Sequence, residues 1–167
     1  KIFFKKHILE EILLIYEDDN HFINIIKKEK FDSIIYGCGV DNTKKNIKIL
    51  KFLLQQPYNL VLDGGVFSMI QEDRHKMIFL IRSRSKITIM TPHAGEFKKV
   101  FPITNNKIND CLNAAKETQS TIVYKGNDTV IGSQNGEAYI NPISTPFLAT
   151  AGSGDVLAGL IGSFLSQ

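Results

Sequence analysis

Short runs of aliphatic and β-branched residues alternate with longer amphipathic stretches along most of this chain. The amphipathic stretches, at 42–55, 66–85 and 106–118, have helical spacing, with a break expected near 72–73. The short apolar runs lead into glycine, acidic or polar residues and lie at 31–36, 59–62, 86–90 and 121–124. This alternation predicts an α/β fold with three layers (α/β/α), in which helices cover both faces of a mostly parallel sheet.

The segments on either side of this alternation carry further local signals. Residues 8–15 and 21–28 have the spacing of two amphipathic helices. An Asn135-Gly136 step between the apolar runs 128–131 and 138–140 predicts a β-hairpin, because this dipeptide readily adopts positive φ angles.

Composition argues against several functional classes. With 167 residues and 43% hydrophobic content, the chain fits one globular domain. The net charge of +3 comes from lysine-rich stretches interspersed with acids, so we expect solvated surfaces and no nucleic-acid partner. No apolar run approaches the length of a bilayer span, so we expect no membrane partner. Cys38 and Cys111 lack metal-site spacing, which indicates packed thiols in a reducing, cytoplasmic setting.

A glycine-rich turn near the C-terminus, Gly152-Ser153-Gly154-Asp155, leads into an apolar helical pattern. The first amides of a helix have no partner within it, and together with the positive end of the helix dipole they suit a phosphate group. Asp155 has two interpretations. It either satisfies the helix dipole or takes the proton from a hydroxyl that attacks a phosphoryl group.

The remaining polar residues of interest follow the predicted strands. Because ligands bind at the carboxyl ends of parallel strands, these residues are expected on one rim of the sheet. Each also has a simpler structural interpretation as a tight turn, a cap or a first-turn acid. The rim residues are Gly37-Cys38-Gly39, Asp63, His93, Glu96 and the loop Lys125-Gly126-Asn127-Asp128-Thr129.

Taken together, three of these motifs resemble the ADP/ATP-dependent NAD(P)H-hydrate dehydratases, members of the ribokinase-like superfamily. The resemblance runs from about Phe31 to the end of the chain. Vitamin kinases of this superfamily typically have Asn where this chain has His93, which favours the dehydratases. The three motifs are Thr91-Pro92-His93-Ala94-Gly95-Glu96-Phe97, Lys125-Gly126-Asn127-Asp128-Thr129-Val130-Ile131 and Ala149-Thr150-Ala151-Gly152-Ser153-Gly154-Asp155-Val156-Leu157.

The resemblance implies a metabolite-repair reaction, in which the S form of hydrated NADH or NADPH is dehydrated at the expense of ADP or ATP. It implies that Asp155 is the catalytic base and that Gly39, His93 and Asp155 contact the hydrated cofactor. Glu96 is expected to organise Mg²⁺ through water. The residues expected to contact the adenine nucleotide are Lys125, Gly126, Asn127, Asp128, Thr129, Gly152, Ser153 and Gly154.

Two loops depart from the family pattern. The family usually has Gly-Pro-Gly-Leu-Gly where this chain has Gly37-Cys38-Gly39-Val40-Asp41. It usually has a second acid in the motif that reads Asp63-Gly64-Gly65-Val66 here.

Two alternative functions stay open beside the dehydratase. A small-molecule kinase of the same superfamily would leave the phosphate on its product, and a non-catalytic remnant would bind nucleotide without turnover. The family's N-terminal portion and last strands and helix have no counterpart, so we expect residues 1–167 to form one ribokinase-like domain that is partial at both ends. Family habit implies a homo-oligomer, and some parent chains carry an additional NAD(P)H-hydrate epimerase domain.

Overall fold

The computed structural model describes residues 18–143 and 145–167. Contacts divide the chain into two units, residues 1–30 and 31–167, and the single-domain organisation stays a prediction. In the first unit, helix α2 (Asp19–Lys28) follows Asp18, whose carboxylate accepts a hydrogen bond from the His21 amide at 2.8 Å. This confirms the helix expected at 21–28, whereas the helix expected at 8–15 lies outside the described residues.

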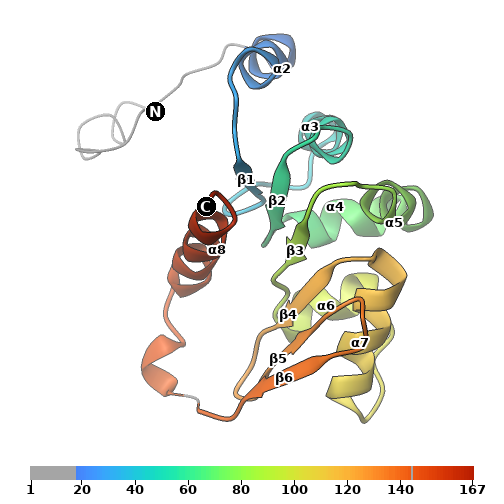
Figure 1. Ribbon diagram of the computed structural model, residues 1–167, viewed down its shortest axis with the longest axis vertical. Coiled ribbons are helices and arrows are strands. Elements are labelled where there is room, and N and C mark those ends of the chain that lie inside the picture. The colour runs from blue at the N-terminus through green and yellow to red at the C-terminus, as the bar shows by residue number, and fades with distance from the viewer. Residues whose placement is uncertain (1–17, 144) are drawn as a thin grey trace. The chain divides into compact units, whose positions relative to one another are not determined.

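The second unit is built on one six-stranded sheet in the order β1-β2-β3-β4-β5-β6 (Figure 1). The last two strands, β5 (Thr129–Gly132) and β6 (Ala138–Asn141), are antiparallel and form the hairpin expected around Asn135-Gly136. The first four strands are parallel to their neighbours, and they are β1 (Ser33–Tyr36), β2 (Asn59–Leu62), β3 (Thr88–Met90) and β4 (Thr121–Tyr124).

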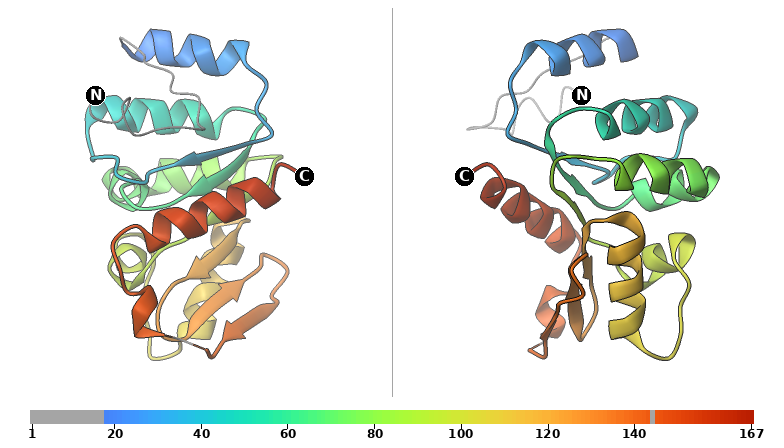
Figure 2. Two further views of the ribbon diagram at one scale, coloured as in Figure 1. Left: turned by 90° about the vertical axis from the view of Figure 1, so that its left-hand side faces the viewer. Right: turned by 45° about the vertical axis from the view of Figure 1, so that its right-hand side comes forward.

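The helices between the parallel strands lie on one face of the sheet (Figures 1 and 2). This follows from topology, because right-handed crossovers between strands added in one direction place every connecting helix on the same side. The break expected near 72–73 is present, since Asp73 both ends α4 and precedes α5. These helices are α3 (Lys44–Leu54), α4 (Val66–Glu72), α5 (Arg74–Arg82), α6 (Ala94–Val100) and α7 (Lys107–Thr118).

The other face of the sheet carries α8 (Ser153–Phe164), which packs on β1 and β2 (Figure 2). The Ser33 hydroxyl donates a hydrogen bond to the Gly162 carbonyl at 2.7 Å, and Gly162 has no side chain because the Ile35 side chain fills that space. Within the described residues, α8 is the one α-helix of the second unit on this face. Helices therefore cover both faces of the sheet, as expected, but unevenly. Among the described α-helices of the second unit, five lie on one face and one lies on the other.

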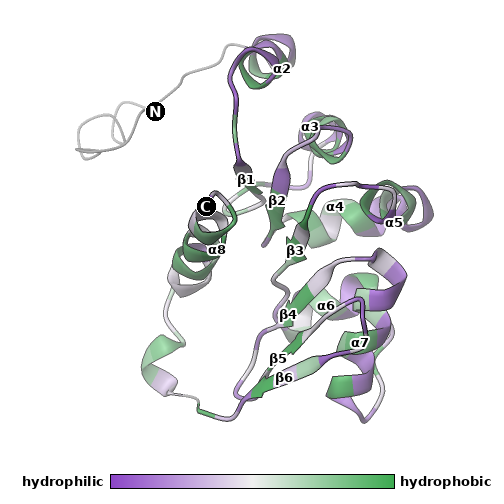
Figure 3. Ribbon diagram, viewed as in Figure 1, coloured by the Kyte–Doolittle hydropathy of each residue, from purple (hydrophilic) through white to green (hydrophobic). Residues whose placement is uncertain are grey.

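Hydrophobic residues run along most of α8 (Figure 3), yet Val156, Leu160 and Phe164 are largely exposed. The first two of these side chains line the cavity described below. The main core lies instead between the sheet and α3–α7, where the largest fully buried side chains include Phe67, Phe97, Leu50, Leu60, Met77 and Met90. Among the residues that the structure describes, no helix has the length and apolar content needed to cross a bilayer.

Arg84 ties the carboxyl end of α3 to the sheet. Its guanidinium donates hydrogen bonds to the carbonyls of Leu53 and Leu54 at 3.1 and 2.8 Å, and to those of Gln56 and Tyr58. Burial lowers the pKa of this side chain to about 10, so it stays charged at neutral pH. A single cation therefore binds carbonyl oxygens in the last turn of α3 and in the segment that follows it, where fewer amides of the helix are available as donors.

Replacing Arg84 with Met should lower the free energy of unfolding by about 3 kcal/mol, because several carbonyls would lose their donor. Arg82→Met is the matched control, since Arg82 is exposed and belongs to the neighbouring helix α5. Urea unfolding of both variants measures the difference. Equal stability of the two variants would show that Arg84 does not hold this end of the helix.

Candidate functional site

The loops that follow β1 to β4 and the start of α8 enclose a cavity of about 1050 Å³. Strand register explains why these loops meet, because Tyr36, Leu62, Met90 and Ile122 are aligned across the four parallel strands. Of the residues expected to form the site, all but Asp128 line this cavity: Gly39, His93, Glu96, Lys125, Gly126, Asn127, Thr129, Gly152, Ser153, Gly154 and Asp155.

The turn before α8 has the conformation that its glycines suggest. Gly152 precedes the helix with φ of 89°, a left-handed conformation that favours glycine. In the described part of the chain, the amides of Gly154 and Asp155 donate to no carbonyl or side chain. Two N–H donors at the positive end of a helix dipole therefore remain available beside the cavity, an arrangement that suits an anion.

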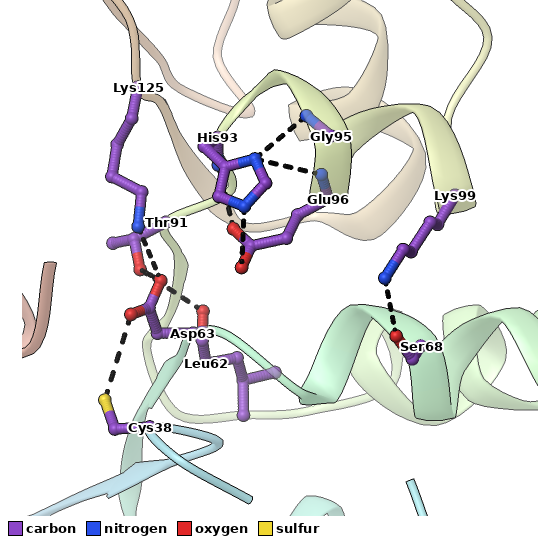
Figure 4. A network of polar contacts seen from close by, with 10 residues as sticks. All are labelled: Cys38, Leu62, Asp63, Ser68, Thr91, His93, Gly95, Glu96, Lys99 and Lys125. Carbon is purple, nitrogen blue, oxygen red and sulfur yellow. Dashed lines mark hydrogen bonds and ion pairs between the residues drawn. The ribbon is translucent and has the colours of Figure 1, made fainter. Parts of the chain in front are cut away.

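The Asp63 carboxylate is the centre of a polar network at this rim (Figure 4). It is buried, and one oxygen, Oδ1, accepts from the Thr91 hydroxyl at 2.7 Å and from the Lys125 ammonium at 2.8 Å. The other oxygen, Oδ2, lies 3.8 Å from the Cys38 sulfur. Residues from the ends of four adjacent strands are therefore joined by one carboxylate, which balances the charge of a lysine that is itself largely buried.

Lys125 also lies beside the start of α8. A Cβ atom placed on Gly154 would lie 3.3 Å from the Lys125 ammonium and 3.6 Å from Asp63 Oδ2. The absence of a side chain at position 154 thus lets the helix backbone approach the ion pair. An anion at the N-terminal start of α8 would have both amide donors and the Lys125 ammonium within reach.

The backbones of the loops that follow β1 and β2 pack directly on each other. The Gly65 amide donates to the Gly37 carbonyl at 3.0 Å. A Cβ atom on Gly37 would lie 1.8 Å from the Asp63 carbonyl, and one on Gly65 would lie 1.8 Å from the Val40 carbonyl. Both positions require glycine, so the second acid of the family motif has no room at position 65 in this chain.

His93 and Glu96 cap helix α6 reciprocally (Figure 4). The ring nitrogen Nδ1 of His93 accepts hydrogen bonds from the amides of Gly95 and Glu96 at 2.9 and 3.3 Å. One Glu96 oxygen accepts from the His93 amide at 2.9 Å, and the other lies 3.3 Å from His93 Nε2. Because Nδ1 accepts, the neutral ring carries its proton on Nε2, and the half-exposed ring faces the cavity.

The loop that contains Lys125 is tied to the loop that contains His93. The Lys125 amide donates to the Pro92 carbonyl at 2.8 Å, and residues 93 and 125 form an isolated parallel bridge. Within the loop, the Thr129 hydroxyl donates to the Gly126 carbonyl at 3.0 Å. The two loops expected to bind different ligands are therefore held side by side.

Asp128 is the one expected site residue that turns away from the cavity. Its carboxylate accepts from the Lys107 ammonium at 2.7 Å. The hydrogen bond from Lys107 is the main cause of a lowered Asp128 pKa. Lys107 was absent from the residues expected from the sequence. The available signal was a cation in the first turn of a helix, where the dipole disfavours it.

The Cys38 thiol lies at the edge of the cavity between two carboxylates. The sulfur and the carboxylates of Asp63 and Asp155 lie within 4.8 Å of one another. Burial, together with the negative charges and hydrogen bonds of Asp63 and Asp155, raises the Cys38 pKa to about 12. The thiol is therefore protonated at neutral pH, as expected for a packed cysteine and not for a nucleophile.

Comparisons with known proteins point to one family. A family model described as NAD(P)H-hydrate dehydratase matches residues 1–167. A bifunctional NAD(P)H-hydrate repair enzyme from Gloeobacter violaceus is 36% identical over 83% of this chain and 27% of that protein. An ADP-dependent (S)-NAD(P)H-hydrate dehydratase from Neisseria meningitidis is 29% identical over 86% of this chain and 50% of that protein. The chain thus spans between a quarter and a half of these relatives.

A similar fold occurs in a solved structure. The ADP/ATP-dependent NAD(P)H-hydrate dehydratase from Bacillus subtilis, co-crystallised with ATP and Mg²⁺, has a TM-score of 0.69 and 27% identity to this chain. The match covers 83% of this chain and 49% of that structure. A ribokinase-like protein from Enterococcus faecalis gives a TM-score of 0.71 at 28% identity, over 87% of this chain and 50% of that one.

The raised pKa of Cys38 predicts slow alkylation. At pH 8 the native thiol should react with iodoacetamide at least about tenfold more slowly than in urea, and the rate should rise as the pH approaches 12. Peptide mass spectrometry separates modification of Cys38 from that of the buried Cys111. Rapid alkylation of Cys38 in the native protein at pH 8 would contradict this geometry.

Proposed function

We propose, because the chain belongs to the NAD(P)H-hydrate dehydratase family, that it dehydrates the S form of hydrated NADH or NADPH at the expense of ADP or ATP. The observation that carries the proposal is the meeting of Lys125, Asp155 and His93 around one cavity. These residues come from two loops and the first turn of α8, which are far apart in the sequence, and they provide a cation, a carboxylate and a ring N–H donor. Such a set suits phosphoryl transfer to a polar substrate.

In this proposal the adenine nucleotide binds along the loop Lys125-Gly126-Asn127-Asp128-Thr129 and the turn Gly152-Ser153-Gly154. The amides of Gly154 and Asp155 and the Lys125 ammonium stabilise the negative charge on the transferred phosphoryl group. All three residues line the cavity, and the two amides donate to no acceptor among the described residues. Asp63 supports this step indirectly. Its carboxylate accepts a hydrogen bond from the largely buried Lys125 ammonium at 2.8 Å and so holds it in place.

Asp155 is the proposed base. Its carboxylate takes the proton from the substrate hydroxyl while the hydroxyl oxygen forms a bond to the terminal phosphorus, and the bond from that phosphorus to the nucleotide breaks. ADP leaves when ATP is used, and AMP leaves when ADP is used. The carbon–oxygen bond then breaks with loss of phosphate, and loss of a ring proton restores the double bond of the reduced nicotinamide.

Gly39 and His93 are the proposed contacts to the hydrated nicotinamide, together with Asp155. Gly39 has φ of 63° and nothing within 4 Å of a Cβ position, so its backbone is open to a ligand in the cavity. His93 can donate to a substrate oxygen through Nε2, which also faces Glu96 at 3.3 Å, since Nδ1 accepts from two amides.

Glu96 is the residue proposed to hold Mg²⁺, and the donor set favours an indirect contact. Both of its oxygens already face His93, and the side chain is 13% exposed at the cavity wall. An octahedral Mg²⁺ that keeps several waters can be held by such a carboxylate through one of them. When bound, Mg²⁺ would reduce the charge repulsion between nucleotide phosphates and an attacking oxygen.

Three further properties belong to the same proposal. Relatives named as bifunctional repair enzymes support an NAD(P)H-hydrate epimerase domain in the parent chain. The two free thiols, Cys38 and Cys111, support a cytoplasmic location. A homo-oligomer is proposed from family habit, and light scattering during gel filtration measures the mass that tests it.

Asp155→Asn should abolish repair while leaving nucleotide binding intact, because it removes a base and keeps the shape of the side chain. We expect the rate of NADH recovery from S-form hydrate, Mg²⁺ and ADP or ATP to fall by about 10²- to 10⁴-fold. Absorbance of reduced nicotinamide measures the rate. Asp32→Asn is the matched control, since Asp32 is exposed and precedes β1 at the opposite end of the strand.

The same assay separates the alternatives. Accumulation of a phosphorylated substrate without NADH recovery would identify a kinase. Nucleotide binding without any turnover in the wild-type chain would identify a non-catalytic remnant and would contradict the dehydratase proposal.

A further inference from the structure

The nucleotide loop of the proposed site contains an acid, although its expected ligand is a polyanion. We propose that Lys107, on helix α7, sets the nucleotide affinity of the 125–129 loop by neutralising and holding Asp128. This inference rests on the proposed nucleotide role of that loop. Lys107 is thereby a positioning residue, acting on the nucleotide through Asp128.

Among the described residues, the hydrogen bonds and the ring contact of the Lys107 ammonium are with the loop and with the strand that precedes it. Its ammonium donates to the Asp128 backbone carbonyl and to Asp128 Oδ1, both at 2.7 Å. It also lies 4.7 Å from the centre of the Tyr124 ring, over its face. Two hydrogen bonds to one residue fix both the backbone and the side chain of Asp128, 21 positions away in the sequence.

The Lys107 ammonium lies against a pair of stacked aromatic rings. Tyr124 stacks on Phe97 with ring centroids 4.1 Å apart and an angle of 3° between the ring planes. Phe97 is fully buried in α6, the helix that His93 caps. The ammonium therefore rests against an aromatic pair that is anchored in the core, and its side chain is 23% exposed. A cation held against an aromatic face loses less freedom when it binds an acid.

Gly126 adds a steric reason for this arrangement. A Cβ atom at position 126 would lie 2.7 Å from the Lys107 ammonium and 3.6 Å from Asp128 Oδ1. The lysine thus occupies the space that a side chain at position 126 would need. The glycine of this loop allows the lysine to reach Asp128 across the loop backbone.

The position of Lys107 in its helix is otherwise unfavourable. It is the first residue of α7, where the helix dipole repels a cation, and Asn106 already caps the helix by accepting from the Asn109 amide at 3.0 Å. Helix stability alone does not favour a lysine here. The ion pair with Asp128 offsets the unfavourable interaction of this cation with the helix dipole.

Electrostatics connects this pair to the nucleotide. Asp128 is adjacent to Asn127 and Thr129, which line the cavity, so an unpaired carboxylate at 128 would repel the phosphates of ADP or ATP. With Lys107 in contact the charge of Asp128 is cancelled, and Asp63 balances the charge of Lys125. Removal of Lys107 would leave the Asp128 carboxylate without this partner, as an uncompensated negative charge next to cavity-lining residues.

Lys107→Met tests the inference directly, with ADP binding to the 167-residue chain measured by isothermal titration calorimetry. We expect the dissociation constant of ADP to rise about tenfold at low salt. The difference from wild type should shrink as ionic strength increases, because screening weakens the repulsion. Lys116→Met is the matched control, since Lys116 is exposed in the last turn of the same helix, and it should bind ADP within about twofold of wild type.

Rescue by a second substitution distinguishes this mechanism from a purely structural role. Lys107→Met combined with Asp128→Asn should return the dissociation constant to within about threefold of wild type, because the carboxylate that repels the phosphates is gone. Thermal unfolding of each variant checks that the fold is retained. A loss of folding would not be repaired by removing the charge of Asp128.

The outcomes are separable from those of the proposed function. Failure of the wild-type chain to bind ADP would overturn the proposed function and this inference with it. Wild-type binding that Lys107→Met leaves unchanged would overturn the inference alone. Equal weakening in the single and double variants would also overturn it, since Lys107 would then act without Asp128.

Discussion

A buried carboxylate at the end of a central strand organises this site. Asp63 has little solvent to stabilise its charge, so its partners must supply that stabilisation, and they are Lys125 and the Thr91 hydroxyl. The requirement is reciprocal, because Lys125 is also largely buried and needs an anion. The Asp63 carboxylate therefore holds the ends of β2, β3 and β4 together. The start of α8 can approach this carboxylate because residue 154 is a glycine.

Much of the architecture could be predicted from local patterns. The strands and helices follow from alternating apolar runs and helical spacing, and each of the helices with a side-chain cap begins after Asp18, Thr43, His93 or Asn106. The common rim also followed from a general rule, since the carboxyl ends of parallel strands lie at one edge. Local information is sufficient for these features because they depend on residues close together in the sequence.

Such local patterns do not predict which side chains of different loops contact each other. The sequence marked Asp63 and Lys125 as rim residues, but their pairing depends on β3 lying between β2 and β4. Asp128 was grouped with the cavity residues by its motif, whereas the structure turns it toward Lys107. That direction is set by α7, whose packing on β4 and β5 no local pattern specifies. Strand order and helix packing decide which polar groups touch.

Because α8 packs on β1, the site can form only late in folding. The Ser33–Gly162 hydrogen bond joins residues 129 positions apart, and the same helix carries Asp155. Contacts of such long range close late, after the local elements have formed. During synthesis, the face of β1 that α8 covers stays open until residues 153–164 have left the ribosome. Asp155 therefore reaches the cavity together with the helix that packs on β1 and β2, so a chain that stops before α8 cannot carry an assembled site.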